Sequence, residues 1–304
     1  MAEIINGLEI SKSIKLEVKE KLQAYYSEGK RSAKLSVVIV GNDPASHTYV
    51  RNIAKTIEVN NVVCDIHMLE ETTSEEEVIN LIESLNVDET VDGIFLQIPL
   101  PKHINNANVT EKIHPDKDVD GLSPTNLGKL MVGRDCYVPC TPQGIMHLLK
   151  TTGIELEGKQ TVMVGRSMSV GKPMVSLLEK ENATVTLCHS KTKNLQEVTK
   201  QADILVVAVG RPHMITKDYI KENAVVIDVG INVNEEGKII GDVAFDDVLD
   251  KVSYITPVPK GVGPMTNAAL LKNVLKAYER WGIINGIPFK WYCWNEKRTS
   301  MSQV

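Results

Sequence analysis

The stretch VMVGRSMSVGKP, residues 162–173, predicts a strand, a turn of small residues and the start of a helix. The apolar, β-branched run before Gly165 is typical of a buried strand. Pro173 suits a first helical position, and Ser169 is the expected cap. Such a junction offers unpaired N–H groups and a positive dipole end to an anion. We therefore expect a nucleotide site. The alternative is an ordinary strand–helix turn, because the spacing Gly165-x5-Gly171 differs from GxGxxG.

The polar residues that follow the next apolar run indicate which nucleotide binds. Residues 184–187 (TVTL) predict the second strand of a βαβ unit, and it ends in CHSKT. An NAD site places an acidic residue about 20 residues on, where it binds the ribose hydroxyls. This chain offers Ser190, Lys191 and, from the first turn, Arg166. These side chains are donors that suit a 2′-phosphate, so we expect NADP, with a solvated Lys191 as the alternative.

Composition is that of an ordinary globular enzyme. The chain has 304 residues, of which 42% are hydrophobic and 24% charged. A net charge of −5 and a pI near 5.9 give no reason to expect nucleic acid or a membrane as partner. The chain starts without a signal-peptide core, and its five cysteines form no CxxC, so we expect reduced thiols and a cytoplasmic location. A metal at Cys136, Cys140 and His147 is a weak alternative, and we expect none.

Helix-like and strand-like stretches alternate along the chain, which predicts an α/β protein of two domains with parallel sheets. We expect a catalytic domain over 1–140 with 268–304, to which the C-terminal helix returns, and a Rossmann-like domain over 141–267. The expected helices are 10–26, 49–59, 74–85, 143–150, one from about 171, and 267–278. The expected strands are 35–40, 62–69, 94–98, 161–164, 184–187, 204–208, 225–229 and an apolar stretch at 252–256.

Several long motifs occur together over residues 3–280. They are VGNDPASHTYV (40–50), GIFLQIPLP (93–101), HPDKDVDGLSPTN (114–126), VPCTPQG (138–144), VGRSMSVGKPM (164–174), CHSKT (188–192), IDVGIN (227–232) and TPVPKGVGPMT (256–266). In this order they resemble the bifunctional methylenetetrahydrofolate dehydrogenase/methenyltetrahydrofolate cyclohydrolase family. The resemblance implies NADP-dependent oxidation of 5,10-methylenetetrahydrofolate, then hydrolysis to 10-formyltetrahydrofolate, in one-carbon metabolism. It also implies a homodimer.

Three side chains suit a folate substrate. Gln97 follows a parallel strand, where ligand groups gather, and its amide can donate and accept. Asp120 can accept N–H bonds from the aminopyrimidine, and the resemblance makes it the pterin anchor. Tyr49 supplies a ring to lie against the pterin. Taken singly, a capping amide, a solvated turn and a half-buried tyrosine are the alternatives.

The same resemblance assigns NADP contacts in the second domain. The matching positions are Gly165, Arg166, Ser167, Ser190 and Ile231. Ile231 follows the strand that ends in Asp-Val-Gly, so we expect a backbone contact there.

The chain departs from the family at two positions. The family carries a lysine four residues after the tyrosine, one helical turn along, and Ile53 stands there. Lys55 cannot replace it, because two residues turn a helix by about 200°. Isoleucine cannot transfer a proton, so we expect impaired hydrolysis. The family's loop usually has glycine where Lys260 stands; Lys260 is either a solvated loop residue or, more speculatively, a replacement.

Two other functions stay open from the sequence. One is a non-catalytic paralogue that binds folate and NADP; the other is an oxidoreductase with a Tyr-x3-Lys dyad, which Ile53 disfavours. The C-terminus also holds a cluster of aromatic residues, either docked or disordered: Trp281, Phe289, Trp291, Tyr292 and Trp294.

Overall fold

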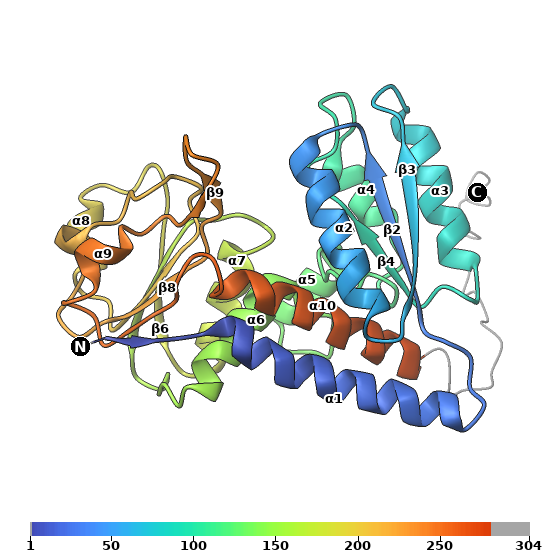
Figure 1. Cartoon of the computed structure of the whole chain (residues 1–304). Coiled ribbons are helices and arrows are strands. Elements are labelled where there is room, and N and C mark those ends of the chain that lie inside the picture. The colour runs from blue at the N-terminus through green and yellow to red at the C-terminus, as the bar shows by residue number, and fades with distance from the viewer. Residues whose placement is uncertain (1, 281–304) are drawn as a thin grey trace, which may run out of the picture.

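The structure is a computed structural model that describes residues 2–280. The aromatic residues from Trp281 to Trp294 therefore lie outside the described residues. Two parallel sheets stand side by side, and long helices run beneath them from one to the other (Figure 1). This confirms the expected two-part α/β fold.

The first sheet has the order β3-β2-β4 and is parallel throughout. Its central strand is β2 (Lys34–Val40), where a continuous apolar run is buried on both faces. Helices cover the sheet, and α3 begins with the expected capping box between Ser74 and Glu77. The other elements here are α2 (Pro44–Glu58), β3 (Val63–Leu69), α3 (Glu75–Val87), β4 (Gly93–Leu96), α4 (Asn106–Lys112) and α5 (Pro124–Met131).

The second sheet has the order β1-β11-β8-β7-β5-β6, again parallel. The expected strands are all present. The strands are β1 (Glu3–Ile4), β5 (Gln160–Val164), β6 (Thr184–Cys188), β7 (Ile204–Val207), β8 (Val225–Asp228) and β11 (Tyr254–Ile255). Between and around them lie α7 (Gly171–Lys180), α8 (Leu195–Thr199), η1 (Lys217–Tyr219) and α9 (Phe245–Val248).

Three helices connect the sheets: α1 (Gly7–Ser27), α6 (Cys140–Thr151) and α10 (Val262–Tyr278). Helix α10 packs on both α6 and α1. Two glycines make this possible, because a Cβ on Gly144 would lie 2.8 Å from Met265 Cβ and one on Gly7 only 2.0 Å from the Gly261 carbonyl oxygen. The start of α10 therefore has a fixed position against both helices.

Some local expectations were wrong. Ser169 does not cap α7; Val170 is the N-cap residue, and Ser167 Oγ accepts the N–H groups of Val170 and Gly171 at 3.2 and 3.4 Å. Pro173 is the third helical residue rather than the first. Helix α10 begins at Val262, five residues before the expected start.

Strand β1 and the hairpin of β9 (Asn232–Val233) and β10 (Ile239–Ile240) were not predicted. Because β1 pairs with β11, the chain starts in the second sheet before it builds the first.

The domain boundaries stay a prediction. Over residues 2–280, no helix is both long and apolar enough to cross a membrane.

The loop before α10 contains a strained residue. Lys260 has a φ of 83°, which costs a side-chain-bearing residue about 1 kcal/mol. Its carbonyl oxygen accepts the Leu8 N–H at 3.0 Å, which holds the backbone in place. We expect Lys260→Gly to raise Tm in calorimetry by about 2–4 °C. Lys260→Ala, which keeps a Cβ, is the control; an equal gain in both variants would contradict the backbone explanation.

Candidate active site

A cleft lies between the two sheets, next to the start of α10. Three predicted residues, Tyr49, Gln97 and Asp120, line it together. The rest of its lining is Phe95, Leu96, Ile98, Leu122, Cys140, Thr141, Ser169 and Thr266. Ser169 comes from the turn after β5 and Tyr49 from α2; the others come from the first sheet, its loops, α6 and α10. The cleft therefore adjoins both the expected folate residues and the expected nucleotide turn.

Gln97 stands directly after β4, at the carboxyl end of the strand. Its backbone N–H donates to the Val38 carbonyl at 2.8 Å, which continues the sheet by one residue. Its side-chain Nε2 donates to the Ile98 carbonyl at 2.8 Å, and only 9% of the residue is exposed. The amide is thus held in one orientation, and its Oε1 has no described partner. Gln97 is placed to accept a hydrogen bond from a ligand.

Tyr49 projects from α2 beside Phe95, with ring centroids 6.4 Å apart. Helix α2 begins after Asp43, whose side chain accepts the Ser46 N–H, with Pro44 in the first turn. Burial, and next the charge of Asp120, raise the pKa of Tyr49, so its hydroxyl stays protonated near neutral pH. Tyr49 can offer a ring face and a hydroxyl donor.

Asp120 is the ionisable group of the cleft. Burial, reinforced by the charge of Asp118, raises its pKa to about 7, although the nearby Cys140 lowers it in part. Asp118 behaves differently, because it is 1% exposed and accepts the N–H groups of Leu122 and Ser123 and the amide of Asn126. Asp118 shapes the loop, and Asp120 is left for a ligand.

Ile53 lies in the core behind the cleft, one helical turn after Tyr49. It is fully buried in a cluster that includes Phe95 and Cys140, with Tyr49 packed against it. Lys55 is exposed, as its position on α2 predicts. Lys260 is also exposed and is not among the residues that line the cleft.

The expected nucleotide turn has the close approach that such a site needs. Gly165 has a φ of 123°, and a Cβ on it would lie 2.2 Å from the Ala208 carbonyl oxygen. A Cβ on Gly171 would lie 2.1 Å from the Gly165 oxygen. Within residues 2–280, the N–H groups of 166–169 donate to no acceptor. The turn therefore fits a phosphate-bearing group at the start of α7.

The cationic residues Arg166 and Lys191 follow neighbouring strands at the same edge of the sheet. In the register of β5 and β6, Val164 pairs with Cys188, and the Gly165 N–H donates to the Cys188 carbonyl at 2.9 Å. Arg166 and Ser190 each follow these paired positions by two residues and lie at the surface. The turn at 188–192 is closed by its own hydrogen bonds, with Ser190 and Lys191 at its tip.

Ile231 stands two strands away, after β8, and is 66% exposed. Neither its N–H nor its carbonyl has a hydrogen-bond partner within the described chain. Its backbone is free for a ligand, and the contact with NADP stays a prediction. Cys140, Thr141 and Thr266 were not predicted to line the cleft, although the quoted motifs contain all three.

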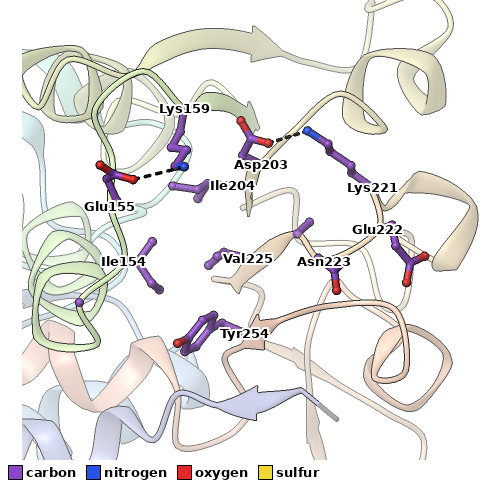
Figure 2. Close-up of a pocket in the computed structure, with 12 residues that line it drawn as sticks. Ile154, Glu155, Lys159, Asp203, Ile204, Lys221, Glu222, Asn223, Val225 and Tyr254 are labelled. Atoms are coloured by element: carbon purple, nitrogen blue, oxygen red, sulfur yellow. Dashed lines mark hydrogen bonds and ion pairs between the residues drawn. The ribbon is translucent and has the colours of Figure 1, made fainter.

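A second pocket lies at the opposite, amino-terminal edge of the second sheet (Figure 2). Its charged side chains pair with one another: Lys159 with Glu155 at 3.4 Å and Lys221 with Asp203 at 2.5 Å. No predicted site residue lines it. It is therefore separate from the cleft and from the nucleotide turn.

Two models of known families match the chain. Residues 5–120 match the catalytic domain of tetrahydrofolate dehydrogenase/cyclohydrolase. Residues 139–281 match the NAD(P)-binding domain of the same family. Curated relatives include the bifunctional protein FolD of Bacillus mycoides, which is 49% identical over 284 residues and covers 93% of this chain and 99% of that protein.

Solved structures share the fold over nearly their whole length. FolD from Campylobacter jejuni superposes with a TM-score of 0.90 at 46% identity, over 92% of this chain and 99% of that one. The Trypanosoma brucei enzyme, solved with NADP and an inhibitor, gives a TM-score of 0.88 at 36% identity, over 92% and 98%.

Proposed function

Because the chain belongs to the tetrahydrofolate dehydrogenase/cyclohydrolase family, we propose that it oxidises 5,10-methylenetetrahydrofolate with NADP while its hydrolysis of the methenyl product is slowed. One observation carries the proposal. The cleft joins Tyr49, Gln97 and Asp120 to the nucleotide turn, yet an isoleucine stands where the family has a lysine.

Oxidation depends on alignment. When bound, NADP would supply the acceptor for the hydride of the methylene carbon. The chain's own residues have only to hold the two ligands face to face, which is positioning work. Gln97 Oε1 and the Asp120 carboxylate offer acceptors to the N–H edge of a pterin, and Tyr49 offers a ring. None of these steps calls for an ammonium at position 53.

Hydrolysis makes a further demand. Water must add to a cationic methenyl carbon, and protons must move, which calls for a titratable group. Ile53 supplies none. Asp120 titrates near neutral pH, but in this proposal it is occupied by the pterin. Lys260 is exposed and outside the cleft lining, which favours a solvated lysine over a replacement.

The donors at the edge of the second sheet support NADP. Arg166, Ser190 and Lys191 gather where an NAD site has an acidic residue. No ion pair within the described chain involves Arg166 or Lys191, so their charges are available to a 2′-phosphate.

We extend the proposal to the location and assembly of the protein. The family resemblance implies a homodimer, and five cysteines without a CxxC pair favour reduced thiols and a cytoplasmic location. Exposed apolar side chains on the β9–β10 hairpin, Val233 and Ile239, offer surface for a second subunit.

Folate affinity should depend on the ionisation of Asp120. Its pKa of about 7 means that the carboxylate, which accepts N–H bonds best, is complete only above that pH. We expect the folate Kd to fall as pH rises from 6 to 8, with proton release on binding, in calorimetry with buffers of different ionisation enthalpy. Asp120→Asn should lose this pH dependence; if it persists there, another group is responsible.

Cofactor choice should depend on Arg166. A lost hydrogen bond to a charged group costs about 1.5–3 kcal/mol, so Arg166→Ala should raise the KM for NADP about tenfold or more and that for NAD far less. Steady-state kinetics with both cofactors checks this. Lys180→Ala, at the far end of α7, is the matched control. Equal effects of Arg166→Ala on both cofactors would remove Arg166 from the 2′-phosphate site.

Ile53→Lys should restore hydrolysis. A general acid–base group contributes about 10²–10⁴-fold, so we expect methenyltetrahydrofolate hydrolysis to rise by that order while NADPH formation changes little. Ile53→Met, of similar length and uncharged, is the control and should stay slow. If Ile53→Met is equally fast, the charge is not what matters. If the unaltered protein forms no NADPH, it is a non-catalytic paralogue.

A further inference from the structure

Two buried carboxylates stand at the carboxyl edge of the second sheet. Asp228 ends β8 and is 3% exposed, whereas Asp242 follows β10 and is fully buried. Asp242 accepts four hydrogen bonds from neutral donors. These are the N–H groups of Val209 (2.7 Å), Gly210 (3.0 Å) and Arg211 (2.8 Å) and the side-chain amide of Asn232 (2.9 Å).

Asp228 completes the arrangement from the other side. Its Oδ1 accepts the N–H groups of Gly230 at 2.9 Å and of Asp242 at 3.0 Å, and its Oδ2 accepts the Val243 N–H at 2.9 Å. Burial raises the pKa of Asp228 to about 6, against these three hydrogen bonds. The two carboxylates thus tie together the loops 209–211 and 230–232 and the chain after β10.

Glycines let the backbone approach both carboxylates. A Cβ on Gly230 would lie 2.4 Å from Asp242 Cγ, and one on Gly241 would lie 1.9 Å from Asp228 Oδ2. No lysine or arginine in the described chain forms an ion pair with either carboxylate. The charges are instead balanced by main-chain donors that must keep fixed positions, because an unsatisfied buried charge is costly.

The loops held in this way border the nucleotide turn. Residue 209 follows Ala208, whose carbonyl oxygen is the atom that Gly165 approaches. Ile231 lies between Gly230, whose N–H donates to Asp228, and Asn232, whose side-chain amide donates to Asp242. Both of its neighbours are therefore held in place, while its own N–H and carbonyl stay free for a ligand. The paired carboxylates therefore hold two turns at the edge of the sheet where NADP is expected to bind: the turn after β7 and the turn after β8.

We propose that Asp242, supported by Asp228, is a positioning residue for the dinucleotide: it holds loops 209–211 and 230–232 in the shape that binds NADP. The inference rests on the proposed function. Asp242 reaches no ligand itself; it acts through the Ile231 backbone and through the loop beside Gly165. Without the carboxylate these loops would have to order when NADP binds, and the ordering would lower affinity.

The test measures the Kd for NADP and for folate by calorimetry, with Tm for each variant. Asp242→Asn leaves one oxygen for four donors, and we expect the Kd for NADP to rise about tenfold or more while that for folate stays within about twofold. Asn232→Ala removes one donor from a half-exposed position and should raise the NADP Kd a few-fold; it carries the test if Asp242→Asn does not fold. Asp203→Asn, at the opposite edge of the same sheet (Figure 2), is the matched control.

The outcomes separate a positioning role from a structural one. A rise in the NADP Kd for the Asp242 and Asn232 variants, with none for Asp203→Asn at a comparable loss of Tm, supports the inference. An unchanged NADP Kd, or parallel losses for both ligands, overturns it. If the unaltered protein binds no NADP, the proposed function fails and this inference with it; if it binds NADP only as well as Asp242→Asn does, only this inference fails.

Discussion

The packing of α10 against α6 and α1 fixes the distance between the two sheets, and the cleft depends on that distance. Gly7 and Gly144 admit the start of α10 at a separation that no larger residue allows. At the same place, the hydroxyls of Thr141 and Thr266 lie 3.0 Å apart on the cleft wall. A wider crossing would separate the residues after β4 from the turn after β5, and a hydride can pass only between carbons held in contact.

The carboxylates of the two domains have two different roles: some hold loops in shape, and one is left to bind a ligand. Asp118, Asp228 and Asp242 are saturated by neutral donors and shape loops. Asp120 has fewer internal donors, and burial, reinforced by the charge of Asp118, raises its pKa. The difference follows from the number of N–H groups that each loop directs at the oxygen atoms. A carboxylate with few internal donors in a cleft is the one suited to binding a ligand.

Much of this was predictable from the sequence. Buried parallel strands such as β2 and β5 give continuous apolar runs, and the motifs around Gln97 and Gly165 stand at their carboxyl ends. The strands of two residues, β1 among them, carry too little periodicity to be recognised. The sequence predicts Ser169 as the residue that accepts the N–H groups at the start of α7, but Ser167 does so, because the choice depends on the exact path of the turn. Asp242 gave no signal at all, because its role arises from donors distant in the sequence.

The central claim is that one chain aligns two ligands for oxidation yet lacks the group that hydrolysis needs, since Ile53 is sealed in the core. Its most direct test follows NADPH and methenyltetrahydrofolate together, by absorbance, after the unaltered protein is mixed with methylenetetrahydrofolate and NADP. We expect methenyltetrahydrofolate to accumulate in step with NADPH and to be hydrolysed far more slowly than it forms. Formation of NADPH without any accumulation, with 10-formyltetrahydrofolate appearing at the same rate, would contradict the account.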